Sequence, residues 1–233
     1  MISGLAREAR LAGGGVSTLC SGGRGDRLRD ALERLDPERF WGVVSFGIAG
    51  ALDPALAPGD MLVGTAVWFE GRLLSADDAL SGALLGRLRA RRGAVRTGLF
   101  AGSEEAVLRV ADKAALRRRT NAVAVDTESH VAADWAARKG LPVSILRVVS
   151  DPAHRALPPL AMRAIKADGR IDLPRILLDL ARSPRQIGAM ALAGRDSQAA
   201  FAALNRCRGV FDPFPPAARE GAPSPRPAPA PAE

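Results

Sequence analysis

The chain has 233 residues, of which 47% are hydrophobic, and it carries a formal net charge of +8. This length is enough to bury one substantial core. No apolar run reaches the roughly 18 residues that a membrane-spanning helix needs, and the N-terminus lacks the basic and then apolar layout of a signal peptide. These features predict a globular protein of the cytoplasm.

The positive charge comes almost entirely from arginines spread over many segments, with the densest groups at 87–92 and 117–120. The chain has no tyrosine and few other aromatic residues that could stack on bases. We therefore expect no nucleic-acid partner, and a solvated basic surface that could work near anionic lipid. Cys20 and Cys207 lie far apart without the spacing of zinc ligands or of a disulfide framework, so no metal site is predicted.

Strand-like and helix-like segments alternate through the first two-thirds of the chain, which is typical of an α/β fold. At most two strand-like residues precede Gly4, so either the first strand is short or the start codon has been placed too far downstream. Apolar, β-branched runs predict strands over 16–20, 42–50, 61–69, 95–100, 122–127 and 142–150. Apolar residues at helical spacing predict helices over 24–35, 76–92, 103–119 and 129–140. Because this order is not a repeat of βαβ units, we expect three layers, with a mixed central sheet flanked by helices.

The last third of the chain has a different pattern. From about Leu160 it is helical, with predicted helices over 173–184 and 184–207. Ser183 as a cap and Pro184 at the first helical position predict the start of the second of these helices. The following residues are mainly proline and alanine, which cannot support a core. We therefore expect one domain over 1–210 and a disordered tail over 211–233.

Two of the predicted strands are followed by carboxylates. Glu128 comes just after the strand over 122–127, and Asp151 directly follows the strand over 142–150. Each has an ordinary structural explanation, because an acidic residue is favoured in the first turn of a helix and Asp before Pro commonly caps a turn. Carboxylates gathered at strand ends can also form a site.

Two glycine-bearing turns strengthen the second interpretation. The stretch "SGGRGD" at 21–26 follows a strand and opens a helix, an arrangement that leaves backbone amides free to hold an anion. Gly47 and Gly50 lie at the end of another predicted strand. Neither turn has the spacing of a Walker loop or of the dinucleotide-binding GxGxxG motif.

Together these segments resemble the nucleoside phosphorylase and nucleosidase superfamily. "SFGIAGALDPALAPGDMLV" and "VAVDTESHVAADWAARKGLPVSILRVVSD" are similar to the family's G-x-A-G-x-L, D/E-M-E and R-x-I/V-S-D motifs. Within this superfamily the chain is most similar to the hopanoid-associated phosphorylases, through "GLAREARLA", "SGG", "VDTESH", "RVVSDPAHRALP" and "SPRQIGAMALAG". The resemblance covers roughly residues 1–208 and implies cleavage of the N-glycosidic bond of a purine nucleoside by a homo-oligomer.

The resemblance also implies roles for the two carboxylates. Asp151, in the position of the family's S-D, would deliver or share the proton at purine N7. Glu128, the last residue of the D-M-E position, would accept hydrogen bonds from the ribose hydroxyls as positive charge develops on the sugar. Thr127 stands where the family often has Met, so we assign it no catalytic role and expect altered contact with the ribose.

Two nucleophiles are compatible with this chemistry. Phosphate needs several oriented donors, and these would be Ser21, Gly22, Gly23 and Arg24. Water needs a general base, and Glu8 is the carboxylate of the N-terminal segment nearest to where nucleosidases keep theirs, although the match is off by one residue and also fits a surface helix. Further candidates for contacts to the base or the phosphate are Arg155, Ser150 and Gly50.

Our first hypothesis is the phosphorolytic release of adenine from adenosylhopane, with inorganic phosphate as co-substrate and no organic cofactor. Such a lipid-linked substrate would need an apolar channel out of the site, which the helices after Leu160 could line. It would also favour activity at a membrane surface. The second hypothesis is a hydrolytic nucleosidase acting on substrates like methylthioadenosine or S-adenosylhomocysteine. The third is a catalytically silent homologue that binds a ligand.

Overall fold

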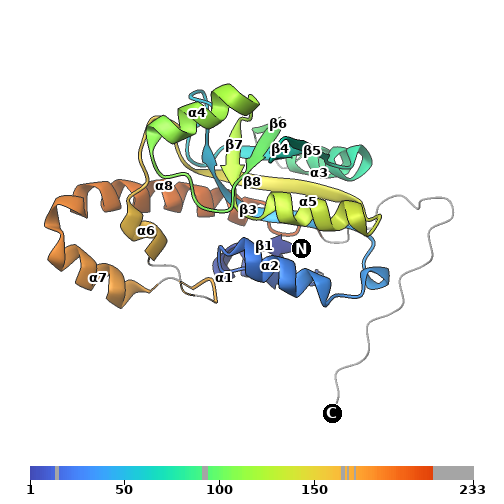
Figure 1. Ribbon diagram of the computed structural model, residues 1–233, viewed down its shortest axis with the longest axis horizontal. Helices are drawn as coiled ribbons and strands as arrows, with labels where there is room; N and C mark the ends of the chain where they lie inside the picture. The colour runs from blue at the N-terminus through green and yellow to red at the C-terminus, as the bar shows by residue number, and fades with distance from the viewer. Residues whose placement is uncertain (14–15, 91–93, 164–165, 167, 171, 212–233) are drawn as a thin grey trace, which may run out of the picture.

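The computed structural model describes residues 1–13, 16–90, 94–163, 166, 168–170 and 172–211. Figure 1 shows the strands gathered in the centre, with helices on both sides of them. The elements in chain order are β1 (Ile2–Ser3), α1 (Ala6–Leu11), β2 (Leu19–Cys20), α2 (Gly25–Glu33), a 3₁₀ turn η1 (Pro37–Arg39), β3 (Val43–Ala51), β4 (Met61–Phe69), β5 (Arg72–Ser75), α3 (Asp78–Ala90), β6 (Val95–Gly102), α4 (Val110–Thr120), β7 (Ala124–Asp126), α5 (Ser129–Arg138), β8 (Val143–Asp151), α6 (Pro159–Arg163), α7 (Leu173–Arg182), a 3₁₀ turn η2 (Pro184–Gln186) and α8 (Ile187–Arg206).

Five of the strands pair in a closed ring. β3 runs parallel to β8 and antiparallel to β7, while β6 runs parallel to both β7 and β4. The ring closes because β4 also pairs with β8 in an antiparallel manner. β1 and β2 extend the sheet in parallel from β3, and β5 lies antiparallel on β4. The mixed sheet flanked by helices that the sequence predicts is therefore confirmed.

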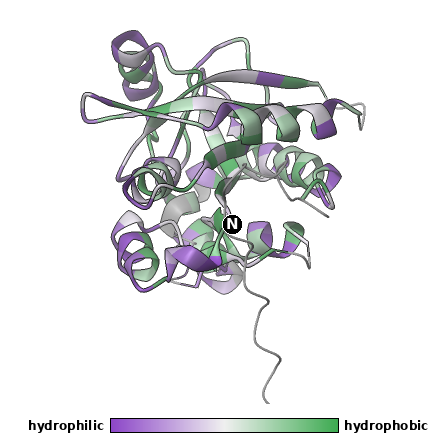
Figure 2. Cartoon of the chain, turned by 90° about the vertical axis from the view of Figure 1, so that its right-hand side faces the viewer, coloured by the Kyte–Doolittle hydropathy of each residue, from purple (hydrophilic) through white to green (hydrophobic). Residues whose placement is uncertain are grey.

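Alternate residues of the central strands face two separate apolar cores, as the two-residue period of a strand requires. On β8, Ile145 and Val149 pack with α2 and α5, whereas Leu146 and Val148 pack with α3 and α8. Figure 2 shows hydrophobic and hydrophilic residues alternating along the helices. The sheet thus has helices packed on both of its faces.

Two expected helix boundaries are wrong. The helix predicted over 103–119 begins only at Val110, because residues 103–109 form a loop in which Ser103 Oγ donates to Glu105 O at 2.6 Å and Glu104 is held by Arg29. Ser183 ends α7, and Pro184 opens the turn η2 before α8 begins at Ile187.

The sequence prediction also missed the strand β5. It forms a hairpin with β4 through the turn at Glu70 and Gly71, which have φ angles of 48° and 78°. Glycine tolerates this left-handed conformation, and two consecutive residues with positive φ give the tight turn that fits the twist of a hairpin. The turn is too short to stand out as a break between two apolar runs.

Phe211, the first residue of the expected tail, packs against the domain. Phe211 is buried, and its ring meets the ring of Phe46 edge to face at a centroid distance of 5.4 Å. The remaining residues of the expected tail, 212–233, lie outside the described residues, so its disorder stays a prediction. Within the described part of the chain, no helix is long and apolar enough to cross a membrane.

The packing of Phe211 leads to a stability prediction. Phe211→Ala removes a buried aromatic ring, and we expect it to lower the free energy of unfolding by about 3 kcal/mol. Urea denaturation of the purified protein measures this change. Leu73→Ala is the control, because Leu73 is 62% exposed and its loss should cost less than about 0.5 kcal/mol. Equal stability of the Phe211 variant and the native chain would place residue 211 outside the folded domain.

Candidate active site

A buried guanidinium forms the centre of the charged interior of the protein. The Arg147 side chain on β8 is 1% exposed, and its Nη2 lies 3.2 Å from Glu128 Oε2 and 3.3 Å from Asp126 Oδ1. The same nitrogen donates to Ser45 Oγ at 2.6 Å. A charge removed from water is tolerated only when it is paired and hydrogen-bonded, and these partners meet that requirement at Nη2, whereas Nε has no hydrogen-bond partner among the described residues.

The position of Glu128 follows from the turn between β7 and α5. Asp126 Oδ1 accepts hydrogen bonds from the backbone amides of Glu128 and Ser129 at 2.9 and 2.6 Å, which fixes the start of the helix. Glu128 Oε1 in turn accepts from Thr127 Oγ1 at 2.7 Å and from Ser21 Oγ at 3.4 Å. Thr127, to which the sequence assigned no catalytic role, therefore orients the carboxylate. Burial raises the pKa of Glu128, and so does the charge of Asp126, against the opposing effect of Arg147.

Glu8 is a second carboxylate of this cluster. It is 1% exposed, although α1 lies at the surface with Arg7 and Arg10 exposed, so Glu8 is on the inner face of this helix. Its Oε2 accepts from the Leu5 amide at 2.7 Å and its Oε1 accepts from the Ile48 amide at 2.9 Å. Burial raises the pKa of Glu8 to about 7, with Arg147 opposing the shift and Glu128 adding to it. A carboxylate with this pKa can take up a proton near neutral pH.

Gly47 lets the arginine and Glu8 approach each other across β3. A Cβ at this position would lie 2.7 Å from Glu8 Cδ and 2.8 Å from Arg147 Nη1, closer than real Cβ contacts come. Gly47 is also the register partner of Arg147 in the parallel pair of β3 and β8. The glycine that the sequence placed near a strand end is thus needed for close packing within the strand.

Asp151 lies at the end of β8 with a partner that the sequence prediction did not name. Its Oδ2 pairs with Nζ of Lys113 on α4, and its Oδ1 accepts from Ser150 Oγ at 2.7 Å. Gly50 leaves room beside it, because a Cβ there would be 3.1 Å from Asp151 Oδ2. Arg147 and Asp151 are four residues apart, at most about 13 Å along an extended strand. The site therefore has two charged ends on one strand.

The predicted anion-binding residues are gathered only in part. Ser21 is buried and reaches Glu128, and Gly22 and Gly23 have φ angles of 68° and 72° that suit the tight turn. The Arg24 guanidinium is exposed and pairs with Asp26, while that of Arg155 pairs with Asp196 on α8. Both guanidinium groups are thus paired with carboxylates away from Glu128 and Glu8. A phosphate site at these residues stays a prediction.

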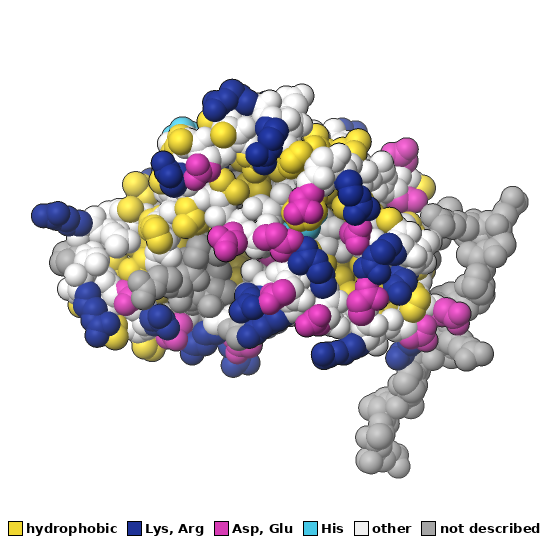
Figure 3. Space-filling model, viewed as in Figure 1, with side chains coloured by type: hydrophobic (Ala, Val, Ile, Leu, Met, Phe, Trp, Pro, Cys, Tyr) yellow, Lys and Arg dark blue, Asp and Glu magenta, His cyan; other side chains and the backbone are white. Residues whose placement is uncertain are grey.

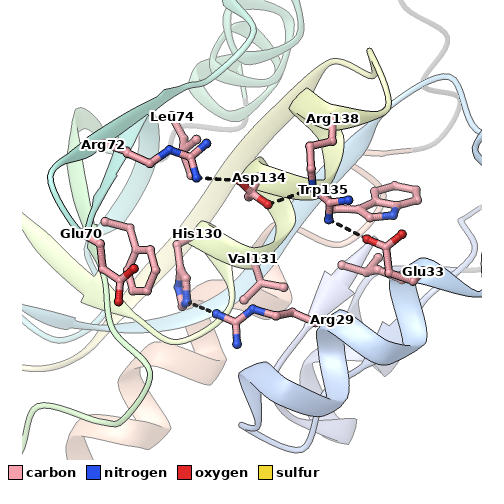
Figure 4. A pocket seen from close by; sticks show the side chains of 12 residues that line it. Arg29, Glu33, Glu70, Arg72, Leu74, His130, Val131, Asp134, Trp135 and Arg138 are labelled. Carbon is pink, nitrogen blue, oxygen red and sulfur yellow. Dashed lines mark hydrogen bonds and ion pairs between the residues drawn. The ribbon is translucent and has the colours of Figure 1, made fainter.

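Two hollows lie outside this cluster. The pocket in Figure 4, about 430 Å³, lies between α2, α5 and the β4–β5 hairpin, and its lining includes none of the predicted site residues. Its arginines are already paired, Arg29 with Glu104 and Arg72 with Asp134 for example. A second pocket of about 530 Å³ is lined by the loop 103–109, by Asp112 and by residues 156–159, and therefore borders the segments that hold Lys113.

Arg147 and Lys113 are the site residues that sequence reasoning missed. Arg147 did carry a signal, because a charged residue inside an apolar strand must find a buried partner. Lys113 lies three residues before the buried Leu116, on the inner face of α4. Figure 3 shows the contrasting situation at the surface, where basic and acidic side chains are interspersed over one face of the molecule.

The raised pKa of Glu8 predicts how stability changes with pH. The folded protein keeps a proton at Glu8 up to about pH 7, whereas the unfolded chain releases it near its ordinary value of 4.5. The unfolded state binds fewer protons between these values, so this group makes the protein less stable as the pH rises through that window. Glu8→Gln removes the effect, and the loss of unfolding free energy from pH 5 to 8 should shrink by about 2 kcal/mol.

Urea denaturation of both proteins at the two pH values tests this prediction. Glu38→Gln, which alters an exposed carboxylate, is the control and should follow the native chain. An unchanged pH dependence in Glu8→Gln would mean that Glu8 titrates as an ordinary surface carboxylate.

The chain is similar to known proteins in its sequence profile and in its fold. Residues 11–170 match the sequence profile of the phosphorylase superfamily. A 5'-methylthioadenosine/S-adenosyl homocysteine nucleosidase of Campylobacter jejuni has a similar structure, with a TM-score of 0.59 and 17% identity over 84% of this chain and 80% of that chain. The corresponding nucleosidase of Helicobacter pylori gives 0.64 and 12% over 91% and 97%, and the futalosine hydrolase of that organism gives 0.61 and 14% over 78% and 95%.

These solved structures share the fold with this chain, whereas no curated protein gave a significant match. The superfamily profile covers most of the chain, including Glu128, Arg147 and Asp151. The chain belongs to the phosphorylase superfamily.

Proposed function

We propose that this protein is a hydrolytic nucleosidase that releases adenine from a 5'-substituted adenosine. The observation that carries this proposal is Glu8, a buried carboxylate with a pKa of about 7 whose neighbours are Arg147 and Glu128. Hydrolysis needs such a base to activate water. Phosphorolysis instead needs several oriented donors for phosphate, and the two arginines expected to help, Arg24 and Arg155, pair with Asp26 and Asp196. The balance therefore favours the second of the sequence hypotheses over the first.

The proposed reaction divides the site between sugar and base. Glu8 removes a proton from water, and the water oxygen attacks C1' of the ribose as the bond from C1' to N9 of the purine breaks. Glu128 accepts hydrogen bonds from the ribose hydroxyls while positive charge develops on the sugar. Asp151, at the other charged end of β8, provides the proton at N7 that makes adenine a good leaving group.

Arg147 is a positive charge among three carboxylates, and it opposes the rise of the Glu8 pKa. Burial opposes its charge, but Asp126, Glu128 and Glu8 together raise the pKa of the guanidinium, which therefore stays charged. One positive charge offsets only part of the charge of three buried carboxylates. Glu8 is the member that can release or take up a proton near neutral pH.

The nature of the 5' substituent defines a second candidate function. The similar solved structures include nucleosidases named for methylthioadenosine and S-adenosyl homocysteine. A larger apolar substituent, as in the adenosylhopane that the resemblance to hopanoid-associated phosphorylases implies, is favoured by one observation. Leu178 on α7 and Ile187 and Leu192 on α8 are large apolar side chains that are all about half exposed, on the helices expected to line an apolar exit. In that function the protein would work at a lipid surface.

Adenine release in phosphate-free buffer tests the proposal. We expect turnover of methylthioadenosine that yields a free reducing sugar, and no increase when phosphate is added. Glu8→Gln should lower kcat by about 10²-fold or more, because the water loses its base. In the native chain, kcat/KM should fall below about pH 7, where Glu8 becomes protonated.

Glu38→Gln is the matched control and should retain full activity. Turnover that requires phosphate and yields a phosphorylated sugar would restore the phosphorylase hypothesis. Turnover of adenosylhopane in lipid vesicles, without turnover of methylthioadenosine, would support the second candidate. The absence of turnover with both nucleosides would favour a ligand-binding homologue.

A further inference from the structure

The ammonium group of Lys113 is completely enclosed. The side chain is 0% exposed, and each of its three N–H groups has an acceptor. These acceptors are Asp151 Oδ2, the carbonyl oxygen of Pro152 at 3.0 Å and the carbonyl oxygen of Arg155 at 3.1 Å. Lys113 therefore ties α4 both to the carboxylate at the end of β8 and to the loop that follows it.

This ion pair conflicts with a simple role for Asp151 as the acid. The Lys113 ammonium group donates a hydrogen bond to Asp151 Oδ2, so the proton nearest to this carboxylate is one that Nζ carries. Its second oxygen, Oδ1, accepts one hydrogen bond from Ser150 and has a further lone pair. The pair does contain one transferable proton, and that proton is on Lys113 Nζ.

The charged side chains near the pair of Lys113 and Asp151 have other partners. Arg155, whose carbonyl oxygen contacts Lys113, directs its guanidinium at Asp196 on α8. On α4, Asp112 pairs with Arg109 and Arg117 pairs with Asp53. Among the described residues, Lys113 is thus the ion-pair partner of Asp151.

We infer that Lys113 supplies, through the Asp151 carboxyl group, the proton that purine N7 accepts when the glycosidic bond breaks. A proton passes from Nζ to the carboxylate and from the carboxyl group to N7, and the electron pair of the C1'–N9 bond goes to the purine. Lys113 is left as a neutral amine beside the Asp151 carboxylate. Glu8 holds the proton taken from water, and exchange with solvent restores both groups after the products leave. Lys113 acts through Asp151 and is therefore a positioning residue that also stores a proton.

This inference rests on the proposed function and makes Lys113→Met its first test. At pH 8 we expect the variant to lose about 10²-fold in kcat, with KM changed much less. The ratio of native to variant kcat should fall toward acid pH, because solvent then protonates Asp151 directly. Arg118→Met, an exposed change on the same helix, should match the native chain at every pH. A native kcat and pH profile in Lys113→Met would overturn the inference.

Lys113→Arg separates the proton from the charge. Arginine preserves the positive charge beside Asp151 but does not release a proton in a protein. We expect kcat to remain low in this variant, and thermal unfolding must show that it is folded. If the folded variant regained the native kcat and pH profile, Lys113 would serve only to position the carboxylate. If it did not fold, the pH profile of Lys113→Met would decide.

A spectroscopic measurement tests the inference without turnover. The chain has only three lysines, Lys113, Lys139 and Lys166, so ¹³C labelling of lysine gives three Cε signals, and Lys113→Met identifies one of them. We expect adenine to shift the Lys113 signal and to leave the other two unchanged. An unmoved signal with adenine bound would refute the role of Lys113 even in an active enzyme. A shifted signal in a protein that releases no adenine would instead refute the proposed function.

Discussion

The interior of this protein depends on one buried guanidinium that shares its space with three carboxylates. Arg147 offsets the charges of Asp126, Glu128 and Glu8, which could not all be buried without it. Its hydrogen bonds reach β3 through Ser45 and the start of α5 through Ser129. The same interaction therefore joins strand to helix and sets the protonation of the carboxylates. Structure and reactivity at this end of the site have one physical origin.

The closed ring of strands makes that interaction geometrically feasible. β3 and β8 run in parallel register, so Gly47 lies opposite Arg147 and Glu8 of α1 can reach across the strand. A side chain at Gly47 would separate the carboxylate from the guanidinium. The ring thus brings Glu8 beside Arg147 on β8, a strand more than a hundred residues further along the chain.

The second charged end of the site, at Asp151, has one cation for one carboxylate. Lys113 and Asp151 form a single pair, in which two backbone carbonyls accept from the other N–H groups of Lys113 and the Ser150 hydroxyl donates to Asp151 Oδ1. The cluster at Arg147 has excess negative charge, which suits a base. The pair at Asp151 has a proton on Lys113 Nζ, which suits an acid. A nucleoside lying along β8 would meet the base at its sugar and the acid at its purine.

The sequence by itself determined the α/β class and most of the strands and helices, and it singled out Glu128 and Asp151 as candidate site residues. These follow from local signals: a two-residue or helical apolar period, and carboxylates where apolar runs stop. Only the tertiary structure decided that Glu8 is buried, that Asp151 faces Lys113, and that Arg24 and Arg155 pair elsewhere. Each of these outcomes depends on contacts between segments distant in the chain, and the pKa of a carboxylate depends on its burial and on the charges that folding brings beside it.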